Sequence, residues 1–179
     1  DLRRSRGLGD VYKRQEFSLF SEFASKVEAI DYSIKHLKAW MKPEKRGTNK
    51  PMNLLGGKSQ VRHFPKGVVG IISPWNLPFG LTVAPLTSAL AAGNRALLKP
   101  SEFVPETAAL FAEVVPKYFS EDEVAVVTGG ADIGQRFAEL PFDHLLFTGS
   151  TRVGAQVMQS ASKNLVPVTL ELGGKSPVV

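Results

Sequence analysis

The chain of 179 residues contains no cysteine, which excludes a disulfide scaffold, a thiolate zinc site and a cysteine nucleophile within this chain. Histidine is scarce as well, with three scattered residues, so we expect no metal site. No hydrophobic run is long enough to span a bilayer, and we expect no membrane segment. With 43% hydrophobic and 22% charged residues, the composition is that of an ordinary globular protein, and we expect a cytoplasmic one.

Acidic residues are fewer than basic ones, and the formal net charge of +5 would suit a protein that binds nucleic acid. The basic excess, however, is confined to the first third of the chain. Residues 1–15 carry five basic and two acidic side chains, residues 16–66 carry ten and five, and residues 67–179 carry seven and ten. Because the longest part is mildly acidic, we expect no nucleic-acid partner.

Residues 1–15 show neither helical nor strand periodicity, and they lack the hydrophobic stretch of a secretory signal. We interpret them as a segment foreign to the natural protein, because an amphipathic pattern begins abruptly at Glu16. The alternatives are a disordered basic arm and an arm that binds RNA or membranes.

Residues 16–66 form a separate N-terminal part in this interpretation. Hydrophobic residues recur every three or four positions over residues 16–41, which predicts one amphipathic helix that ends before Pro43. Residues 47–66 predict two short strands about a turn at Gly56 and Gly57.

From residue 67 onward, short hydrophobic runs alternate with helical stretches. The predicted strands cover residues 67–73, 95–98, 124–127, 144–147 and 166–172, and the predicted helices cover residues 81–92, 105–118, 133–138 and 153–162. Strands that alternate with helices over short links form a parallel, doubly wound α/β sheet. We therefore predict an α/β domain over residues 67–179.

Small, polar or charged residues follow every predicted strand. These segments are residues 73–76, 99–102, 128–130, 148–154 and 171–177. Each one alone is most simply a turn or a helix cap. Because the carboxyl ends of parallel strands share one edge, the five segments together predict a nucleotide site at that edge.

Two familiar phosphate-binding motifs are absent. Residues 174–176 read GKS, but the first glycine that a P-loop requires is replaced by Thr169. Residues 149–154 read GSTRVG, which is not the pattern GxGxxG. The free amides at the start of the helix predicted over residues 153–162 still favour an anion.

The sequence resembles the aldehyde dehydrogenase family from about Pro65 to Val179. The resemblance rests on PWN (74–76), KPSE (99–102), FTGSTRVG (147–154) and LELGGKSP (170–177), in the family's order and approximate spacing. The segments VVTGG and LVPVTLELGGKSP resemble the branch that contains coniferyl-aldehyde and fatty-aldehyde dehydrogenases. This resemblance implies that the α/β domain is Rossmann-like and binds NAD.

The resemblance also implies the oxidation of an aldehyde, aromatic or aliphatic, to the carboxylic acid. In the family a cysteine thiolate attacks the carbonyl, hydride passes to NAD(P)+, and a carboxylate-activated water hydrolyses the thioester. Asn76 matches the asparagine that stabilises the oxyanion, and Glu171 matches the general base.

Further positions match the residues that hold the cofactor in the family. Lys99 and Glu102 match residues that bind the adenosine ribose hydroxyls, and the acid there favours NAD without excluding NADP. Gly149 and Ser150 match the turn beside the pyrophosphate, and Gly154 matches a glycine that lets the next helix pack closely. The other expected cofactor contacts are Ser73, Pro74, Trp75, Gly130 and Leu172.

One departure from the family is large. Its nucleophilic cysteine lies well beyond the position of Glu171, whereas this chain ends at Val179 without a cysteine. We therefore expect an inactive N-terminal fragment that lacks the substrate-binding half, of an enzyme that forms a homodimer or homotetramer when full length. The alternative is a natural, non-catalytic module that binds a dinucleotide or a partner.

Overall fold

The structure is a computed structural model that describes residues 18–176. The predicted foreign segment 1–15, the first residues of the predicted N-terminal helix and residues 177–179 lie outside the described part.

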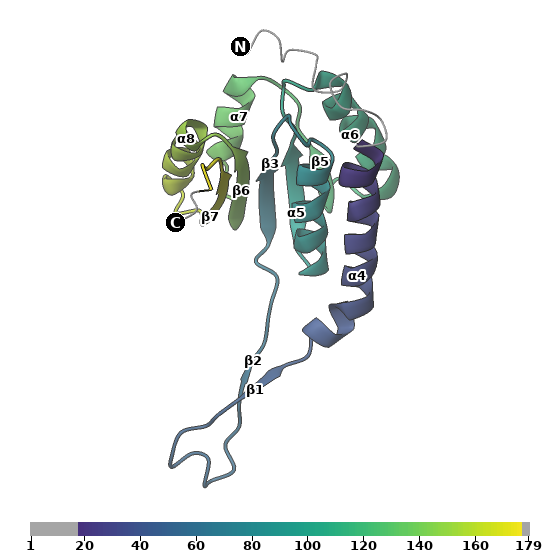
Figure 1. The fold of residues 1–179 in the computed structure, drawn as a ribbon. Helices are drawn as coiled ribbons and strands as arrows, with labels where there is room; N and C mark the ends of the chain where they lie inside the picture. Colours follow the sequence, from purple (N-terminus) through teal and green to yellow (C-terminus); the bar gives the residue numbers. More distant parts are fainter. Residues whose placement is uncertain (1–17, 177–179) are drawn as a thin grey trace.

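The N-terminal helix is present, but its first turns differ from a regular α-helix. A π-helix, η1, spans Leu19–Ala24 and continues directly into α4, which spans Ser25–Trp40. The hydrophobic stripe is covered only in part, since Phe20 is 76% exposed. Helix α4 packs beside α5, and several hydrophobic side chains of the stripe stay exposed beside this contact, among them Val27 and Ile34 (Figure 1).

The hairpin is also present, but its first strand lies earlier than expected. Strand β1 (Glu44–Arg46) pairs antiparallel with β2 (Ser59–Val61), and Glu44 is opposite Val61. The prediction placed both strands within residues 47–66 and is wrong for the first one. Residues 47–58 form an irregular connection with turns over residues 50–56, because the chain there contains Pro51 and glycines that do not sustain a strand. The hairpin extends away from the rest of the molecule (Figure 1).

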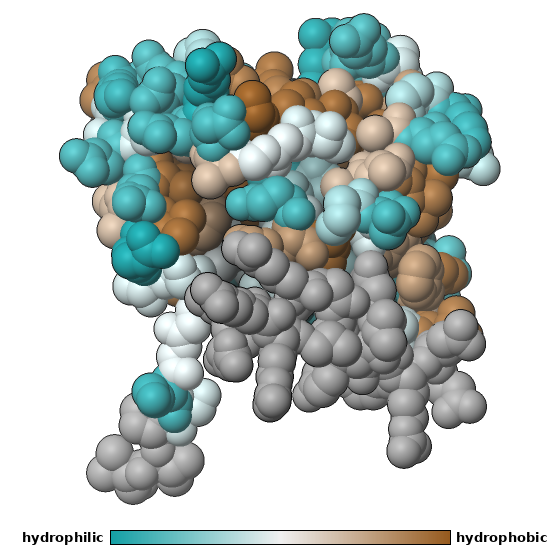
Figure 2. Space-filling view, turned by 90° about the horizontal axis from the view of Figure 1, so that it is seen from above, coloured by the Kyte–Doolittle hydropathy of each residue, from teal (hydrophilic) through white to brown (hydrophobic). Residues whose placement is uncertain are grey.

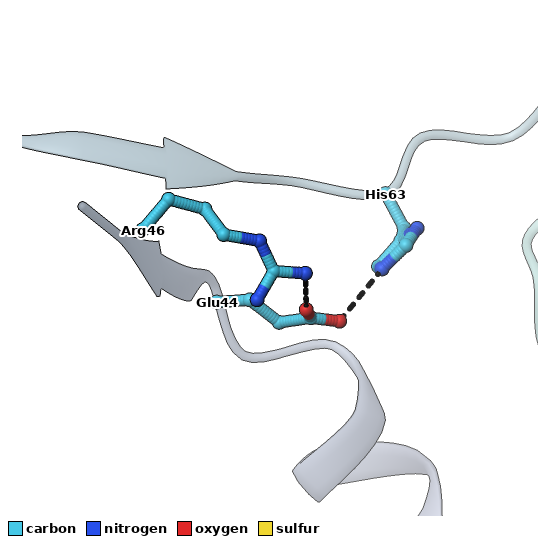
Figure 3. Close-up of polar contacts among 3 residues, drawn as sticks. All are labelled: Glu44, Arg46 and His63. Carbon is cyan, nitrogen blue, oxygen red and sulfur yellow. Dashed lines mark hydrogen bonds and ion pairs between the residues drawn. The ribbon is translucent and has the colours of Figure 1, made fainter. Parts of the chain in front are cut away.

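The side chain of Glu44 receives two contacts within this hairpin (Figure 3). His63 Nε2 lies 3.2 Å from Glu44 Oε1, and the Arg46 guanidinium donates to Glu44 Oε2. The hydrogen bond from His63 and the charge of Arg46 together lower the pKa of the Glu44 carboxyl. All three side chains are exposed, so water screens this ion-pair cluster.

The central sheet has five strands in the order β5-β4-β3-β6-β7, and all its neighbouring pairs are parallel. The strands are β3 (Val68–Ile72), β4 (Arg95–Lys99), β5 (Val124–Val126), β6 (His144–Gly149) and β7 (Val168–Leu172). The chain runs outward from β3 to β5, returns to the centre and runs outward again from β6. This order confirms the predicted doubly wound sheet and places its switch point between β3 and β6.

Helices cover both faces of the sheet. Helices α5 (Gly80–Ala91) and α6 (Pro105–Tyr118) pack on one face, and α7 (Ala131–Ala138) and α8 (Thr151–Ser162) pack on the other. The three central strands contribute Ile71, Leu98 and Leu145, which are fully buried. Such nearly continuous hydrophobic strands are expected where helices cover both faces.

Helix α8 begins two residues earlier than the sequence predicts. Its N-cap, Ser150, accepts a hydrogen bond from the amide of Val153 over 3.4 Å. Because of this cap, the helix begins at Thr151, and Thr151 and Arg152 belong to its first turn. Strand β6 likewise continues to Gly149, because that residue still pairs with Leu172 of β7.

Candidate functional site

The segments that follow the strands meet at one edge of the sheet, which is the upper edge in Figure 1. They meet there because every strand of the sheet points the same way. Figure 2 shows the molecule from this side, where hydrophilic and hydrophobic side chains form a mosaic. All the sequence-predicted site residues follow a strand or end one, or lie in the first turns of the next helix.

The segment between β3 and α5 is anchored at its start. Ser73 is 3% exposed, and its amide donates to the carbonyl of Lys99 on the neighbouring strand over 3.2 Å. Its hydroxyl accepts a hydrogen bond of 2.6 Å from Thr82 of α5. The exposed residues Trp75 (41% exposed) and Asn76 therefore follow a residue that is fixed by two hydrogen bonds.

Lys99 carries a buried positive charge at the end of β4. It is 2% exposed, and its Nζ donates to Glu102 Oε2 over 3.0 Å and to the carbonyl of Pro100 over 3.2 Å. The Glu102 side chain remains 33% exposed. An ammonium and a carboxylate that are held together in this way present a donor and an acceptor, as vicinal hydroxyl groups require.

A glycine of α7 lies against the side chain of Lys99. Gly130 is the N-cap of α7, and Gly134 lies one turn later in that helix. A Cβ on Gly134 would lie 3.5 Å from Lys99 Cε, so the lysine stem runs directly along the helix. Gly134 and Thr82 were not singled out from the sequence, because neither belongs to a recognisable motif and each contact is made across two secondary-structure elements.

The turn between β6 and α8 brings the backbone close to hydrophobic side chains. A Cβ on Gly149 would lie 2.5 Å from the Phe147 ring, and a Cβ on Gly154 would lie 2.7 Å from Leu172 Cδ2. A side chain at position 149 or 154 would therefore force these neighbours apart. The N-terminus of α8 opens at this edge. Its partial positive charge, and first amides that have no acceptor within the helix, favour an anion.

Strand β7 brings Glu171 to the same edge. Glu171 is opposite Thr148 in the strand register, and Leu172 is opposite Gly149. Both Glu171 and Leu172 are exposed. The carboxylate of Glu171 is thus placed next to the β6–α8 turn and is open to solvent.

Within residues 18–176, no three His, Asp or Glu side chains gather in a way that would hold a metal ion. In the same part of the chain no helix has the length and hydrophobicity needed to cross a membrane.

The fold and the site together define a class of protein. A doubly wound sheet, with a paired lysine and glutamate after one strand and a glycine-lined helix N-terminus after another, is an arrangement typical of proteins that bind dinucleotides. The donors fit such a cofactor: charged hydrogen-bonding groups for ribose hydroxyls, and amides for phosphate oxygens. The chain belongs to the aldehyde dehydrogenase family, which its sequence matches over residues 13–179.

Similar curated proteins include coniferyl aldehyde dehydrogenases of bacteria. The "Probable coniferyl aldehyde dehydrogenase" of Caulobacter vibrioides is 52% identical over 165 residues, which are 92% of this chain and 34% of that protein. The coniferyl aldehyde dehydrogenase of Pseudomonas sp. strain HR199 is 48% identical over 93% of this chain and 34% of its own length. The chain thus spans about a third of these relatives.

Solved structures show the same arrangement. The substrate-bound AldH of Staphylococcus aureus is 42% identical and superposes with a TM-score of 0.84 over 89% of this chain and 34% of that one. The aldehyde dehydrogenase of Mycobacterium tuberculosis in complex with NAD+ is 36% identical, with a TM-score of 0.75 over 89% of this chain and 32% of that one. These likenesses confirm both the family and the α/β fold expected from the sequence.

Proposed function

We propose that this chain forms the NAD-binding part of an enzyme that oxidises an aldehyde to the carboxylic acid. The observation that carries the proposal is the buried Lys99 with its partner Glu102, at the same sheet edge as the N-terminus of α8. Bound NAD supplies an acceptor for the hydride. Lys99 and Glu102 bind the adenosine ribose, and the amides after Ser150 bind the pyrophosphate.

The carboxylate of Glu102 favours NAD over NADP. A 2′-phosphate on the ribose would stand beside this negative charge, and Lys99 is already neutralised by it. Ser73, Pro74, Trp75, Gly130, Gly149 and Leu172 form the rest of the proposed cofactor cleft, and Gly154 allows α8 to approach β7.

Two side chains of this chain have proposed roles in the chemistry. The side-chain NH2 of Asn76 donates a hydrogen bond to the oxygen that becomes negatively charged when a cysteine attacks the aldehyde. That cysteine would belong to the part of the relatives that this chain does not span. Glu171 removes a proton from the water that hydrolyses the thioester, because an exposed carboxylate beside the site can act as a general base.

The names of the relatives suggest the substrate class, and the hairpin suggests the assembly. Relatives are named coniferyl aldehyde dehydrogenase, and others are named aldehyde dehydrogenase family 3 member B1. We propose an aromatic or a medium- to long-chain aliphatic aldehyde as substrate, in a cytoplasmic enzyme. The projecting hairpin, with Leu54 and Leu55 exposed, suits a homodimer or homotetramer of that enzyme.

The test has a binding arm and an activity arm. The chain should bind NAD saturably and bind NADP more weakly, both measured by calorimetry. It should not oxidise coniferyl aldehyde or an aliphatic aldehyde by itself, because it holds no cysteine. If the folded chain binds no NAD, the proposed cofactor site is wrong. If the chain alone oxidises an aldehyde, the predicted need for a cysteine outside this chain is wrong.

A further inference from the structure

The first turn of α5 has no cap of its own. Its N-cap residue is Phe79, whose side chain accepts no hydrogen bond, and its first turn contains no acidic residue. The first amides of any helix have no partner within the helix and need one from elsewhere. This gap matters because α5 follows directly after the segment that carries Trp75 and Asn76.

Glu22 of the π-helix η1 supplies the missing cap. Its Oε2 accepts hydrogen bonds from the amide of Phe79 over 3.0 Å and from the amide of Gly80 over 3.2 Å. The residue is only 5% exposed although it is charged. A carboxylate at a helix N-terminus is stabilised by the helix dipole, and hydrogen bonds to a charged acceptor are stronger than neutral ones.

Other contacts hold Glu22 against the start of α5. The ring of the next residue, Phe23, stacks on the ring of Phe79 with centroids 4.1 Å apart. A Cβ on Gly80 would lie 3.0 Å from Lys26 Cε and 3.8 Å from Glu22 Cα, so the start of α5 lies against η1 and α4. Figure 1 shows α4 and α5 side by side, with both helices starting at the upper edge.

The segment with Trp75 and Asn76 is therefore held at both ends. Ser73 is bound at the upstream end by Lys99 and Thr82, and Glu22 holds the downstream end. We propose that Glu22 is a positioning residue, which sets where this segment stands at the edge of the sheet. The catalytic importance of this position rests on the proposed function, in which Asn76 stabilises the oxyanion. The contact of Glu22 with the amides of Phe79 and Gly80 does not depend on that function.

The test follows the segment itself in the full 179-residue chain. A Trp40→Phe substitution leaves Trp75 as the single tryptophan, whose quenching by acrylamide reports how open the segment is. Amide hydrogen exchange at Phe79 and Gly80 reports the two hydrogen bonds. The variants are Glu22→Ala, Glu22→Gln, which keeps an acceptor oxygen, and Glu28→Ala as the matched control, an exposed glutamate of α4.

In Glu22→Ala we expect exchange protection at Phe79 and Gly80 to fall about tenfold or more, because a charged acceptor for two amides is lost. Quenching of Trp75 should rise at the same time. Glu22→Gln should recover most of the protection, and Glu28→Ala should behave as the unsubstituted chain. Protection and quenching unchanged in Glu22→Ala would overturn the proposal. If Glu22→Ala does not fold, unprotected amides at Phe79 and Gly80 in the unsubstituted chain would overturn it equally.

A separate NAD titration of the same variants tests whether the placement of the segment with Trp75 and Asn76 affects NAD binding. Glu22→Ala should weaken NAD binding by several-fold, and Glu22→Gln should restore it. A chain that binds no NAD at all would contradict the proposed function, whereas the quenching and exchange readouts, which need no cofactor, would still decide the role of Glu22.

Discussion

Gly154, in the first turns of α8, faces the side chain of Leu172 at the end of β7 so closely that a Cβ at position 154 would lie 2.7 Å from Leu172 Cδ2. Gly154 is buried, and Leu172 is 38% exposed. The helix and the strand approach each other this closely only because one of the two residues has no side chain. The contact sets the distance between the proposed phosphate-binding helix and the strand that carries Glu171.

Gly154→Ala should therefore destabilise the chain by about 1–2 kcal/mol, because the new methyl group displaces Leu172. In a helix without this contact, the same substitution stabilises by about 0.5–1 kcal/mol. Gly134→Ala in α7 is the matched control, since its Cβ would meet Lys99 Cε at an ordinary 3.5 Å. Chemical denaturation measures both. Equal stability of Gly154→Ala and Gly134→Ala would contradict the close contact, as would an unchanged loss in a chain that also carries Leu172→Ala.

Glu102→Gln should weaken NAD binding about tenfold, because the ribose loses a charged hydrogen-bond acceptor. The preference for NAD over NADP should decrease, since the repulsion of a 2′-phosphate is removed. The stability should fall by about 1–2 kcal/mol, because the buried ammonium of Lys99 loses its counter-charge while a third of the Glu102 side chain still faces water. Calorimetric titration with both dinucleotides measures the first two effects.

The control for this variant is Glu106→Gln, an exposed glutamate in the first turn of α6. It should leave both affinities unchanged. Equal NAD affinity in Glu102→Gln and in the unsubstituted chain would contradict the assigned ribose contact.

Asn76→Ala should lower the turnover of the enzyme that contains this chain by about 10²- to 10³-fold, with little change in NAD affinity, because only the developing oxyanion uses its NH2 group. Asn76→Asp should be at least as damaging, since it places a negative charge beside the oxyanion. Steady-state kinetics in that enzyme provide the measurement. A turnover close to that of the unsubstituted enzyme in Asn76→Ala would remove Asn76 from the chemistry.

His144, at the start of β6, makes the stability depend on pH. Its Nε2 lies 2.9 Å from Thr169 Oγ1, and its Nδ1 lies 3.3 Å from Lys66 Nζ. Partial burial, and then the positive charge of Lys66, lower the pKa of His144 below its ordinary value of 6.5. The unfolded chain therefore takes up a proton at a higher pH than the folded chain, and the free energy of unfolding falls as the pH drops below about 6.5.

Thermal melts from pH 8 to pH 5 measure this dependence. His144→Gln should flatten the loss of stability that begins near pH 6.5, and Lys66→Met should reduce it, because the second cause of the low pKa is removed. A slope in His144→Gln that equals that of the unsubstituted chain would show that another group is responsible.

Much of the fold could be predicted from the sequence, because it depends on short-range patterns. The alternation of hydrophobic runs and helical stretches located each strand of the sheet, and the glycines and polar residues after the strands located the edge. Only the first strand of the hairpin was expected too late in the chain, because Glu44–Arg46 consists of charged residues and has no hydrophobic alternation. The π-helical turn of η1 likewise has no pattern that distinguishes it from an α-helix.

The sequence by itself thus determined the α/β class, the family and which residues stand at the carboxyl ends of the strands. Only the tertiary structure decided the strand order β5-β4-β3-β6-β7, the burial of Lys99 against Gly134 and the cap that Glu22 places on α5. The physical reason is distance along the chain. Periodicity reflects contacts within a few residues, whereas Glu22 and Phe79 meet only after two helices have packed together.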